Sequence, residues 1–314
     1  MIGSGIVRHL NDLGNFDLLL VDDLKETDKW KNLVGKQFYD FISKHALFNW
    51  LQGREDEVDA ILHMGACSDT METNGDYLME NNFRFTIRLA QWALSFGKRF
   101  IYASSAATYG DGAQGFSDNE EQLEALRPIN LYAFSKHLVD LWMKREKVLN
   151  RVVGLKYFNV FGPNEYHKGR MASMVLKMTH IAQRGEQIRL FKSNDPKNFG
   201  DGEQCRDFIY LKDAVRMTCA FLQPEHRKKG GIYNIGMGEA TTWNTLAGAL
   251  FKALNRQPNI AYIDMPAELN RQYQNYTCAS MSKFHQFFPN FSKTVVSTAV
   301  REYVQDFLLQ HERW

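Results

Sequence analysis

The sequence predicts an α/β fold, with a doubly wound parallel sheet followed by a smaller α/β domain. Over the first two-thirds of the chain, short apolar runs alternate with longer amphipathic stretches, as in successive βαβ units. Beyond residue 158 glycines and prolines interrupt this alternation. We expect a nucleotide-binding domain of residues 1–158, 210–238 and 276–290, and a substrate domain of residues 159–209, 239–275 and 291–314.

The elements of the first domain follow from the apolar pattern in chain order. A pattern with helical spacing starts at the first residue. Four short runs rich in β-branched, leucine or aromatic residues then predict strands, and two long stretches with apolar residues at helical spacing predict crossover helices. The predicted strands are 18–21, 60–63, 100–103 and 152–157, and the predicted helices are 81–96 and 131–148.

The second part of the chain is less regular. The stretch 193–204 is polar and contains Asp-Pro and two glycines, which predicts a loop, and we expect this loop to cover a binding cleft. Short strands and helices resume after it. The predicted strands are 207–210 and 231–235, and the predicted helices are 242–254 and 294–309.

Composition excludes several classes of protein. With 44% hydrophobic and 24% charged residues the chain is globular, and a formal net charge of +2 provides no field that would attract nucleic acid or an anionic membrane. No apolar run approaches the roughly 18–20 residues of a membrane span, and the first residues lack a secretory pattern, so we expect a cytoplasmic protein. The 4 cysteines and 9 histidines show no ligand spacing, and we expect neither disulfides nor a metal.

The strongest candidate for chemistry is the pair Tyr132 and Lys136, the only Tyr-x-x-x-Lys among 13 tyrosines. Residues four apart share a helix face, so the ammonium of Lys136 can lie near the phenol of Tyr132. A nearby cation lowers the phenol's pKa and makes it a usable base. An isolated pair of this kind also arises by chance as a surface pair.

Ser105 favours a catalytic pair over a chance surface pair, because it follows a buried-looking strand and precedes Tyr132 in the chain. Ligands of open α/β sheets bind at the carboxyl ends of the strands, where Ser105 would lie. Its hydroxyl could hold a substrate oxygen against Tyr132 for alcohol oxidation and ketone reduction. The alternative is a serine that only caps the next turn.

Several residues indicate a dinucleotide cofactor. Gly3 is the remnant of a glycine-rich turn, and Asp22 and Asp23 end the first predicted strand, where an acidic residue holds the adenosine ribose. That rule favours NAD, whereas Lys25 and Lys29 could meet the 2′-phosphate of NADP, and spacing leaves the choice open. Small residues after the strand 60–63 let the backbone approach a cofactor. Gly65, Ala66 and Asn81 are therefore candidate contacts, whereas packing is expected for His63 and Cys67.

These residues together resemble the extended short-chain dehydrogenases/reductases that act on nucleotide sugars, a Rossmann-like family. The resemblance rests on Ser105 with Tyr132 and Lys136, on Lys-Tyr-Phe-Asn-Val-Phe-Gly-Pro at 156–163, and on Arg-Asp-Phe-Ile-Tyr at 206–210. It extends over essentially the whole chain. Two stretches, 65–70 and 167–173, are more specific and are similar to the ADP-heptose 6-epimerases of lipopolysaccharide core biosynthesis.

The resemblance implies an enzyme that keeps NADP bound and inverts C6 of the heptose in ADP-D-glycero-β-D-manno-heptose. Oxidation gives a 6-ketone, and the hydride returns to the opposite face, so two acid/base groups are needed. By position these are Tyr132 and Lys168, with Ser105 polarising the oxygen and Lys136 contacting the nicotinamide ribose. Lys168 can serve only if burial or a neighbouring cation such as Arg170 lowers its pKa; the alternative is a solvated loop cation.

The resemblance also implies contacts for both ligands and a homo-oligomer. The expected cofactor contacts are Gly3, Asp22, Asp23, Lys29, Lys44, Met64, Gly65, Ala66, Cys67, Ser68, Asn81, Lys136, Val160 and Lys168. The expected ADP-heptose contacts are Asn159, Arg170, Lys177, Phe191, Lys192, Ser193, Asn194, Arg206 and Tyr273. The chain departs from the family pattern at Asn164, where arginine is usual, at Lys177, where histidine is frequent, and in an apparent insertion at 195–204.

Three other functions are weighed against this one. A 4,6-dehydratase is disfavoured because its relatives place Asp-Glu directly after the hydroxyl residue, where this chain has Ala106 and Ala107. A 4-epimerase such as UDP-glucose 4-epimerase needs only Ser105, Tyr132 and Lys136 and stays open. A non-enzymatic NADP-binding member would typically lack one of Tyr132 and Lys136, and both are present.

The start of the chain differs from that of the family. Related chains begin with a strand and a Thr-Gly-Gly-x-Gly-Phe-Ile-Gly turn, and residues 1–4 match only its end, so about nine residues, including the first strand and two glycines, are absent. That strand is central in the sheet, and the glycines admit the pyrophosphate. We therefore expect a true start upstream of Met1, and poor folding and weak cofactor binding for protein made from Met1.

Overall fold

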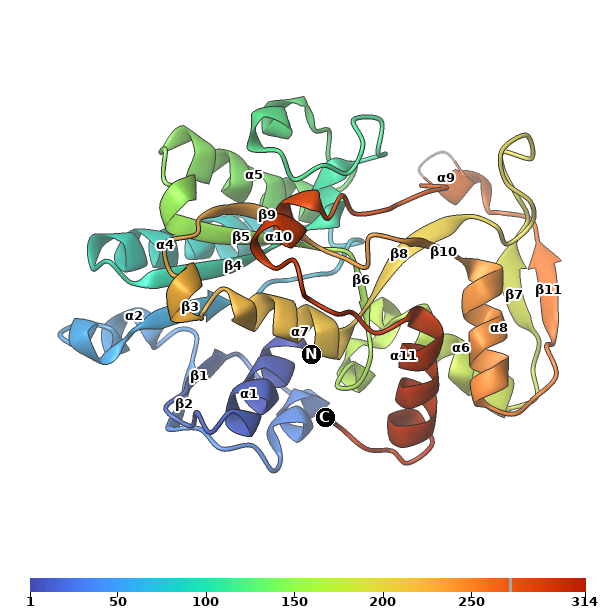
Figure 1. Ribbon diagram of the computed structural model, residues 1–314, viewed down its shortest axis with the longest axis horizontal. Helices are drawn as coiled ribbons and strands as arrows, with labels where there is room; N and C mark the ends of the chain where they lie inside the picture. Colours follow the sequence, from blue (N-terminus) through green and yellow to red (C-terminus); the bar gives the residue numbers. More distant parts are fainter. Residues whose placement is uncertain (271–272) are drawn as a thin grey trace.

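The computed structural model describes residues 1–270 and 273–314 and confirms the α/β fold with parallel sheets (Figure 1). Residues 271 and 272, which fall in the predicted substrate domain, lie outside the described residues. The main sheet is parallel with the order β3-β4-β5-β9, and β1 and β2 form a separate parallel pair. These strands are β1 (Leu19–Asp22), β2 (Asp40–Ser43), β3 (Ala60–His63), β4 (Arg99–Ser105), β5 (Val152–Tyr157) and β9 (Gly231–Ile235).

Alternation along β4 explains why helices cover both faces of the main sheet. Phe100 and Tyr102 pack in one apolar cluster with side chains of α4 and α5, whereas Ile101 packs in another with side chains of α7 and α10. All six residues of β5 are buried, as expected for a parallel strand covered on both sides. The helices are α4 (Phe85–Ser95), α5 (Leu131–Arg145), α7 (Leu211–Ala220) and α10 (Ser282–Phe287).

The strands and helices outside the main sheet surround a separate core. Its strands form a three-stranded sheet of order β10-β8-β6 and a parallel pair of β7 and β11, and its helices pack around Tyr303 and Leu250. Its elements are β6 (Asn159–Phe161), α6 (Met174–Gln183), β7 (Ile188–Phe191), β8 (Cys205–Tyr210), β10 (Ala240–Thr242), α8 (Trp243–Ala253), β11 (Ile260–Ile263), α9 (Ala267–Asn270) and α11 (Val296–Glu302).

The predicted helix at the start of the chain is α1 (Ile2–Asp12), which packs against α7 (Figure 1). Short helical segments connect the other elements. They are α2 (Leu47–Trp50), α3 (Gly75–Leu78), the 3₁₀ turns Asp28–Leu33, Glu55–Glu57, Ala106–Tyr109, Glu120–Ala125, Leu149–Arg151, Tyr166–Met171 and Pro224–His226, and the π-helical segments Met79–Arg84 and Tyr303–Leu308. Among the described residues, none of the helices is long and apolar enough to cross a membrane.

One predicted boundary is wrong. Asn81 does not open the long helix, because the helical stretch already begins at Gly75, where the side chain of Asn74 accepts a hydrogen bond from the backbone N–H of Tyr77 at 2.9 Å. An N-cap of this kind fixes a helix start. Asn81 instead lies in the π-helical segment between α3 and α4.

A buried carboxylate, that of Asp207 on β8, binds backbone that lies far away in the chain. Asp207 is 0% exposed, and its oxygens accept hydrogen bonds from the backbone N–H groups of Met237 at 2.6 Å, Gly238 at 2.9 Å and Ala279 at 2.9 Å. These residues belong to two segments, because Met237 and Gly238 follow β9 and Ala279 precedes α10. One side chain of β8 therefore holds both segments in place.

Replacing Asp207 by alanine is expected to destabilise the protein by roughly 3–5 kcal/mol, because three buried N–H groups lose their acceptor. The measurement is urea denaturation followed by circular dichroism. The control is Asp12→Ala, which removes an exposed carboxylate paired with Arg8 at 2.8 Å and should change the stability by less than about 1 kcal/mol. Equal midpoints for the two variants would contradict the assigned role of Asp207.

Candidate functional site

Ser105, Tyr132 and Lys136 are brought together at the carboxyl end of β4. β4 ends at Ser105, and α5 begins at Leu131 because the side chain of Asn130 accepts from the backbone N–H of Ala133 at 2.8 Å. The hydroxyl of Ser105 lies near enough to that of Tyr132 to act on its pKa. Lys136, one turn further along α5 and 2% exposed, donates from Nζ to the carbonyl oxygen of Ala103 at 2.8 Å.

Ser105 has the capping role that was considered for it, and this role is compatible with a catalytic one. Its Oγ accepts a hydrogen bond from the backbone N–H of Ala107 at 3.1 Å, which caps the turn Ala106–Tyr109. Since a hydroxyl oxygen has two lone pairs and one proton, it can still bond to Tyr132 and to a substrate oxygen. The capping bond fixes the hydroxyl in place rather than removing it from the site.

Burial dominates the electrostatics of this group. Burial raises the pKa of Tyr132, and the hydrogen bond with Ser105 opposes that rise. Burial also lowers the pKa of Lys136 to about 8, against the opposing effect of Asp140. The expectation that Lys136 lowers the pKa of Tyr132 is not seen, because the ammonium is directed to a backbone carbonyl and loss of solvent outweighs it.

The predicted adenosine-side residues lie at the end of β1. Lys29 Nζ lies 2.9 Å from Asp22 Oδ1 and donates to the carbonyl oxygen of Asp23 at 2.5 Å. Lys44, which directly follows β2, donates from Nζ to Asn81 Oδ1 at 2.8 Å. A carboxylate that can accept from a ribose hydroxyl is thus placed beside cations that can pair with a phosphate.

The loop after β3 contains several small residues. A Cβ at Gly65 would meet no atom nearer than His63 Cε1 at 3.8 Å, so the protein itself does not require glycine there. Ala66 and Ser68 flank Cys67 in this loop, and Met64 Sδ accepts a hydrogen bond from Tyr157 at 3.3 Å. The small side chains leave backbone accessible, as a bound dinucleotide needs.

Asn82 holds this loop in place, a role that the sequence did not reveal. It is fully buried, and its side chain accepts from the N–H of Cys67 at 2.9 Å and donates to the carbonyl oxygen of Cys67 at 2.9 Å. The same amide donates to Ser135 on α5 at 3.0 Å. The cofactor loop is thereby tied to the helix that carries Tyr132.

His63 is a packing residue, as expected. It is buried beside Thr86, and burial and the charge of Lys136 lower its pKa to about 3.

The four cysteines, Cys67, Cys205, Cys219 and Cys278, are free thiols. Within residues 1–270 and 273–314, His, Cys, Asp and Glu side chains form no group that could hold a metal.

Lys168 lies in the turn Tyr166–Met171, apart from the described contacts of Ser105 and Tyr132. In the part of the chain that the structure describes, its Nζ lies 3.9 Å from Met1 Sδ. Burial and the charge of Lys177 lower the pKa of Lys168, and Glu165 opposes that shift. The direction is the one a basic lysine requires, but Lys177 is the neighbouring cation, in place of the predicted Arg170.

Arg170 is occupied by an ion pair across the site. Its Nη2 lies 2.5 Å from Asp69 Oδ2, and its carbonyl oxygen accepts from Lys177 Nζ at 2.6 Å. Asp69 belongs to the loop after β3, so this pair connects the cofactor loop to the turn that carries Lys168. Hydrogen bonding to Arg170 lowers the pKa of Asp69, and the carboxylate stays charged at neutral pH.

Arg206 is held between aromatic rings. Its guanidinium carbon lies 4.9 Å from the ring centre of Tyr273 and 5.9 Å from that of Trp243, whose Nε1 donates to the hydroxyl of Tyr273 at 3.0 Å. Phe191 packs edge-on against Tyr273. In the described chain no carboxylate forms an ion pair with Arg206, which leaves its charge for an anionic ligand. Trp243 was missed because an isolated tryptophan carries no motif.

The other predicted substrate contacts have partners within the protein. Lys192 pairs with Asp264 at 3.1 Å, and Asn194 donates to Asn270 Oδ1 at 2.7 Å. The N–H of Ser193 donates to Asp201 at 2.8 Å, inside the loop predicted over 193–204. Asn159 is exposed and Val160 half-buried on β6, which runs parallel to β8.

Asn164, which stands where the family usually has arginine, has a structural role. Asn164 is fully buried with a φ of 69°, a conformation that asparagine tolerates better than most residues. Its side chain accepts from the N–H of Trp314 at 3.0 Å and donates to the carbonyl oxygen of Trp314 at 2.7 Å and to Ser4 at 3.2 Å. Asn164 therefore acts as a structural clamp on main chain.

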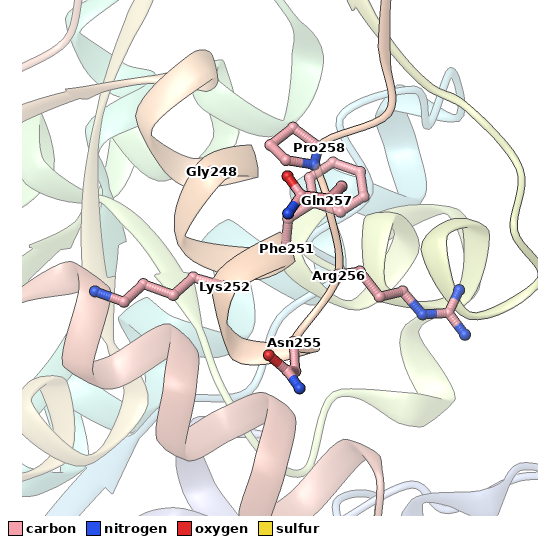
Figure 2. Close-up of a pocket in the computed structure, with 7 residues that line it drawn as sticks. All are labelled: Gly248, Phe251, Lys252, Asn255, Arg256, Gln257 and Pro258. Carbon is pink, nitrogen blue, oxygen red and sulfur yellow. The ribbon is translucent and has the colours of Figure 1, made fainter.

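Two hollows on the surface lie away from these residues. One is lined by Gly248, Phe251, Lys252, Asn255, Arg256, Gln257 and Pro258 at the end of α8 (Figure 2). The other lies between α6 and β7. Neither includes a predicted site residue, so the candidate site is defined by the strand ends and not by these hollows.

Comparison with known proteins gives consistent results. Residues 1–236 match the NAD dependent epimerase/dehydratase family. An ADP-L-glycero-D-manno-heptose-6-epimerase of Nitratidesulfovibrio vulgaris (strain DP4) is 45% identical over 310 residues, which are 98% of this chain and 95% of the relative. The enzyme of the same name from Fusobacterium nucleatum is 40% identical, over 100% of this chain and 97% of its own.

Solved structures agree. The crystal structure of the Helicobacter pylori ADP-L-glycero-D-manno-heptose-6-epimerase superposes with a TM-score of 0.79 at 26% identity, over 98% of this chain and 92% of that one. A Thermotoga maritima UDP-glucose 4-epimerase, at 21% identity and a TM-score of 0.79, shares the fold. The extent and identity of these matches, together with the Ser105, Tyr132 and Lys136 group, show that this chain belongs to the NAD dependent epimerase/dehydratase family and, within it, to the ADP-L-glycero-D-manno-heptose-6-epimerases.

Proposed function

We propose that this epimerase inverts C6 of ADP-D-glycero-β-D-manno-heptose with bound NADP, for the synthesis of lipopolysaccharide core heptose. The observation that carries the proposal is the grouping of Ser105 at the end of β4 with Tyr132 and the buried Lys136 of α5, whose Nζ donates to the carbonyl oxygen of Ala103 on β4. A base, a hydroxyl donor and a fixed cation are the groups that oxidation of an alcohol needs. The relatives named above support the substrate.

The residues divide the reaction between them. Tyr132 takes the proton of the C6 hydroxyl while Ser105 donates a hydrogen bond to the same oxygen, so that the C–H bond of C6 can break to give a ketone. A nicotinamide cofactor held by the residues at the ends of β1 and β3 would supply the acceptor and the donor for this hydride. The keto sugar then rotates so that the opposite face of its carbonyl group receives the hydride. Lys168 donates its proton to the carbonyl oxygen during this second transfer. The reverse reaction uses the two groups in exchanged roles.

The test of the function is direct. Purified protein is incubated with ADP-D-glycero-β-D-manno-heptose, and the two C6 epimers are separated by anion-exchange chromatography. Interconversion to a constant ratio without added reductant is expected, because the hydride is returned. Absence of interconversion, together with turnover of UDP-glucose, would contradict the proposal and favour a 4-epimerase. The homo-oligomer and the cytoplasmic location stay part of the proposal, and light scattering tests the former.

NADP is the proposed cofactor, and Lys29 supports it. Its ammonium lies 2.9 Å from the Asp22 carboxylate that would hold the adenosine ribose. A 2′-phosphate on that ribose would therefore meet a cation beside the carboxylate, which alone would repel it. Three other expected cofactor contacts support the proposal by their positions: Asp22 ends β1, Lys44 directly follows β2, and Lys44 Nζ donates to Asn81 Oδ1.

Lys29→Ala is expected to raise the Kd of NADP about tenfold, equivalent to roughly 1.4 kcal/mol, and to leave the Kd of NAD nearly unchanged. Fluorescence titration with the reduced forms of both cofactors measures the effect. Lys31→Ala is the matched control, since Lys31 lies in the same turn and pairs with Asp28 at 3.0 Å. An equal change for both cofactors would show that Lys29 does not select the phosphate.

A further inference from the structure

A buried ion pair that the reaction above does not use lies directly behind the catalytic group. Asp140 of α5 and Lys156 of β5 are both 0% exposed, and Lys156 Nζ lies 2.7 Å from Asp140 Oδ2. Burying two charges costs more than burying two apolar side chains of the same size, unless hydrogen bonds compensate. Apolar side chains would therefore fill this part of the core at a lower cost in free energy.

Hydrogen bonds to both members of the pair connect it to the end of β4. Asp140 accepts from the hydroxyl of Tyr102 at 2.9 Å and from Ser104 Oγ at 2.7 Å. Lys156 donates to Thr108 Oγ1, which in turn donates to the carbonyl oxygen of Ser105 at 2.7 Å. A continuous path of side chains thus runs from helix α5 to the backbone of Ser105.

The pair also faces Lys136. On α5, Tyr132, Lys136 and Asp140 follow one another at intervals of four residues and so lie on one face of the helix. Asp140 is the charged group that opposes the effect of burial on the pKa of Lys136. Its carboxylate is therefore placed to act on the catalytic lysine through space and on Ser105 through hydrogen bonds.

We propose that Asp140, with Lys156 as its partner, is a positioning residue: its carboxylate keeps the Lys136 ammonium charged and ties helix α5 to the end of β4, so that Tyr132 stays in register with Ser105. This inference rests on the proposed function. The role of Lys156 is to compensate the charge of Asp140 and to hold Thr108. Neither residue contacts the substrate.

The surroundings allow the charge of Lys136 to be followed on its own. Burial lowers the pKa of His63 to about 3 and raises that of Tyr102 above its usual value of 10. These two groups therefore stay uncharged between about pH 6 and 9. The titratable and charged groups that face Lys136 and Tyr132 are His63 from β3, Cys67 from the loop after it, Tyr102 from β4, Tyr132 and Asp140 from α5, and Lys156 from β5.

The test measures the titration of Lys136 directly. The protein is labelled with ¹³Cε-lysine, the Lys136 signal is identified by its loss in Lys136→Met, and its chemical shift is followed against pH. Asp140→Asn should lower the pKa of Lys136 by about one unit or more, because a buried negative charge is removed. Glu146→Gln, which removes an exposed carboxylate near the end of the same helix, should leave it unchanged.

Kinetics complete the test. In Asp140→Asn the alkaline limb of kcat/KM should move to lower pH by the same amount, and kcat should fall at least tenfold with KM changed less than threefold. If Asp140→Asn does not fold, Asp140→Asn with Lys156→Met leaves no unpaired buried charge and should shift the Lys136 signal in the same direction. An unchanged Lys136 titration in a folded variant overturns the proposal, whatever its activity. Absence of epimerisation by the unaltered protein would instead overturn the proposed function.

Discussion

Tyr132→Phe is expected to lower kcat for epimerisation by about 100- to 10,000-fold, the usual contribution of a positioned acid or base. The substitution removes only the phenolic hydroxyl, which lies near Ser105, so the affinity for the nucleotide sugar should change little. Steady-state kinetics in both directions, with the epimers separated, measure the loss. The effect should be the same in both directions, because each direction passes through the same ketone.

Tyr262→Phe is the control for that experiment. Tyr262 is 41% exposed on β11 and donates to Asn244 at 3.1 Å, outside the candidate site. This variant should keep the full kcat. If Tyr132→Phe retained more than about a tenth of the activity, Tyr132 could not be the group that moves the hydroxyl proton.

Lys168→Met is expected to slow epimerisation by about 100-fold or more, because the second face of the ketone then lacks its proton donor. The loss should appear in kcat. Lys252→Met, at the exposed end of α8, is the control and should have no effect. Full activity of Lys168→Met would exclude the two-base scheme and leave the alternative of a solvated loop cation.

The pH dependence gives Lys168 a second signature. In the direction of epimerisation in which Lys168 acts as the base, its amine must be neutral, so the rate rises as the pH increases through the pKa of Lys168. In the reverse reaction Lys168 must be protonated, so the rate falls over the same pH range. Since the charge of Lys177 lowers that pKa, Lys177→Met should raise it and move both limbs to higher pH. A pH–rate profile that stays the same in Lys177→Met would show that Lys168 does not titrate in the reaction.

The sequence predicted the main sheet well and the second domain poorly. β3, β5 and β9 begin and end at the predicted residues, because each is a short apolar run between polar residues. β6, β7, β10 and β11 were missed, since they have three or four residues each and are partly exposed. Such strands are defined by pairing with distant segments, and local pattern does not record that pairing.

In the candidate site, too, local sequence patterns predicted some residues but not the contacts between distant segments. Ser105 and Tyr132 were predictable, because each stands at the end or start of a recognisable element. The sequence could not show that Asn82 clamps the loop around Cys67, or that Trp243 packs against Arg206, since these contacts join segments far apart in the chain. It also misjudged the electrostatics of Tyr132, because burial cannot be read from residue spacing.

The aromatic setting of Arg206 has a consequence for the proposed inversion. The ketone must present both faces to one nicotinamide, so the sugar has to swing while the rest of the ligand stays in place. A guanidinium wedged between the rings of Tyr273 and Trp243, on a strand paired on both sides, is a fixed pivot for a diphosphate. The heptose can then rotate about the bonds beyond that anchor without leaving the enzyme, and the intermediate is retained by its tether instead of by a closed chamber.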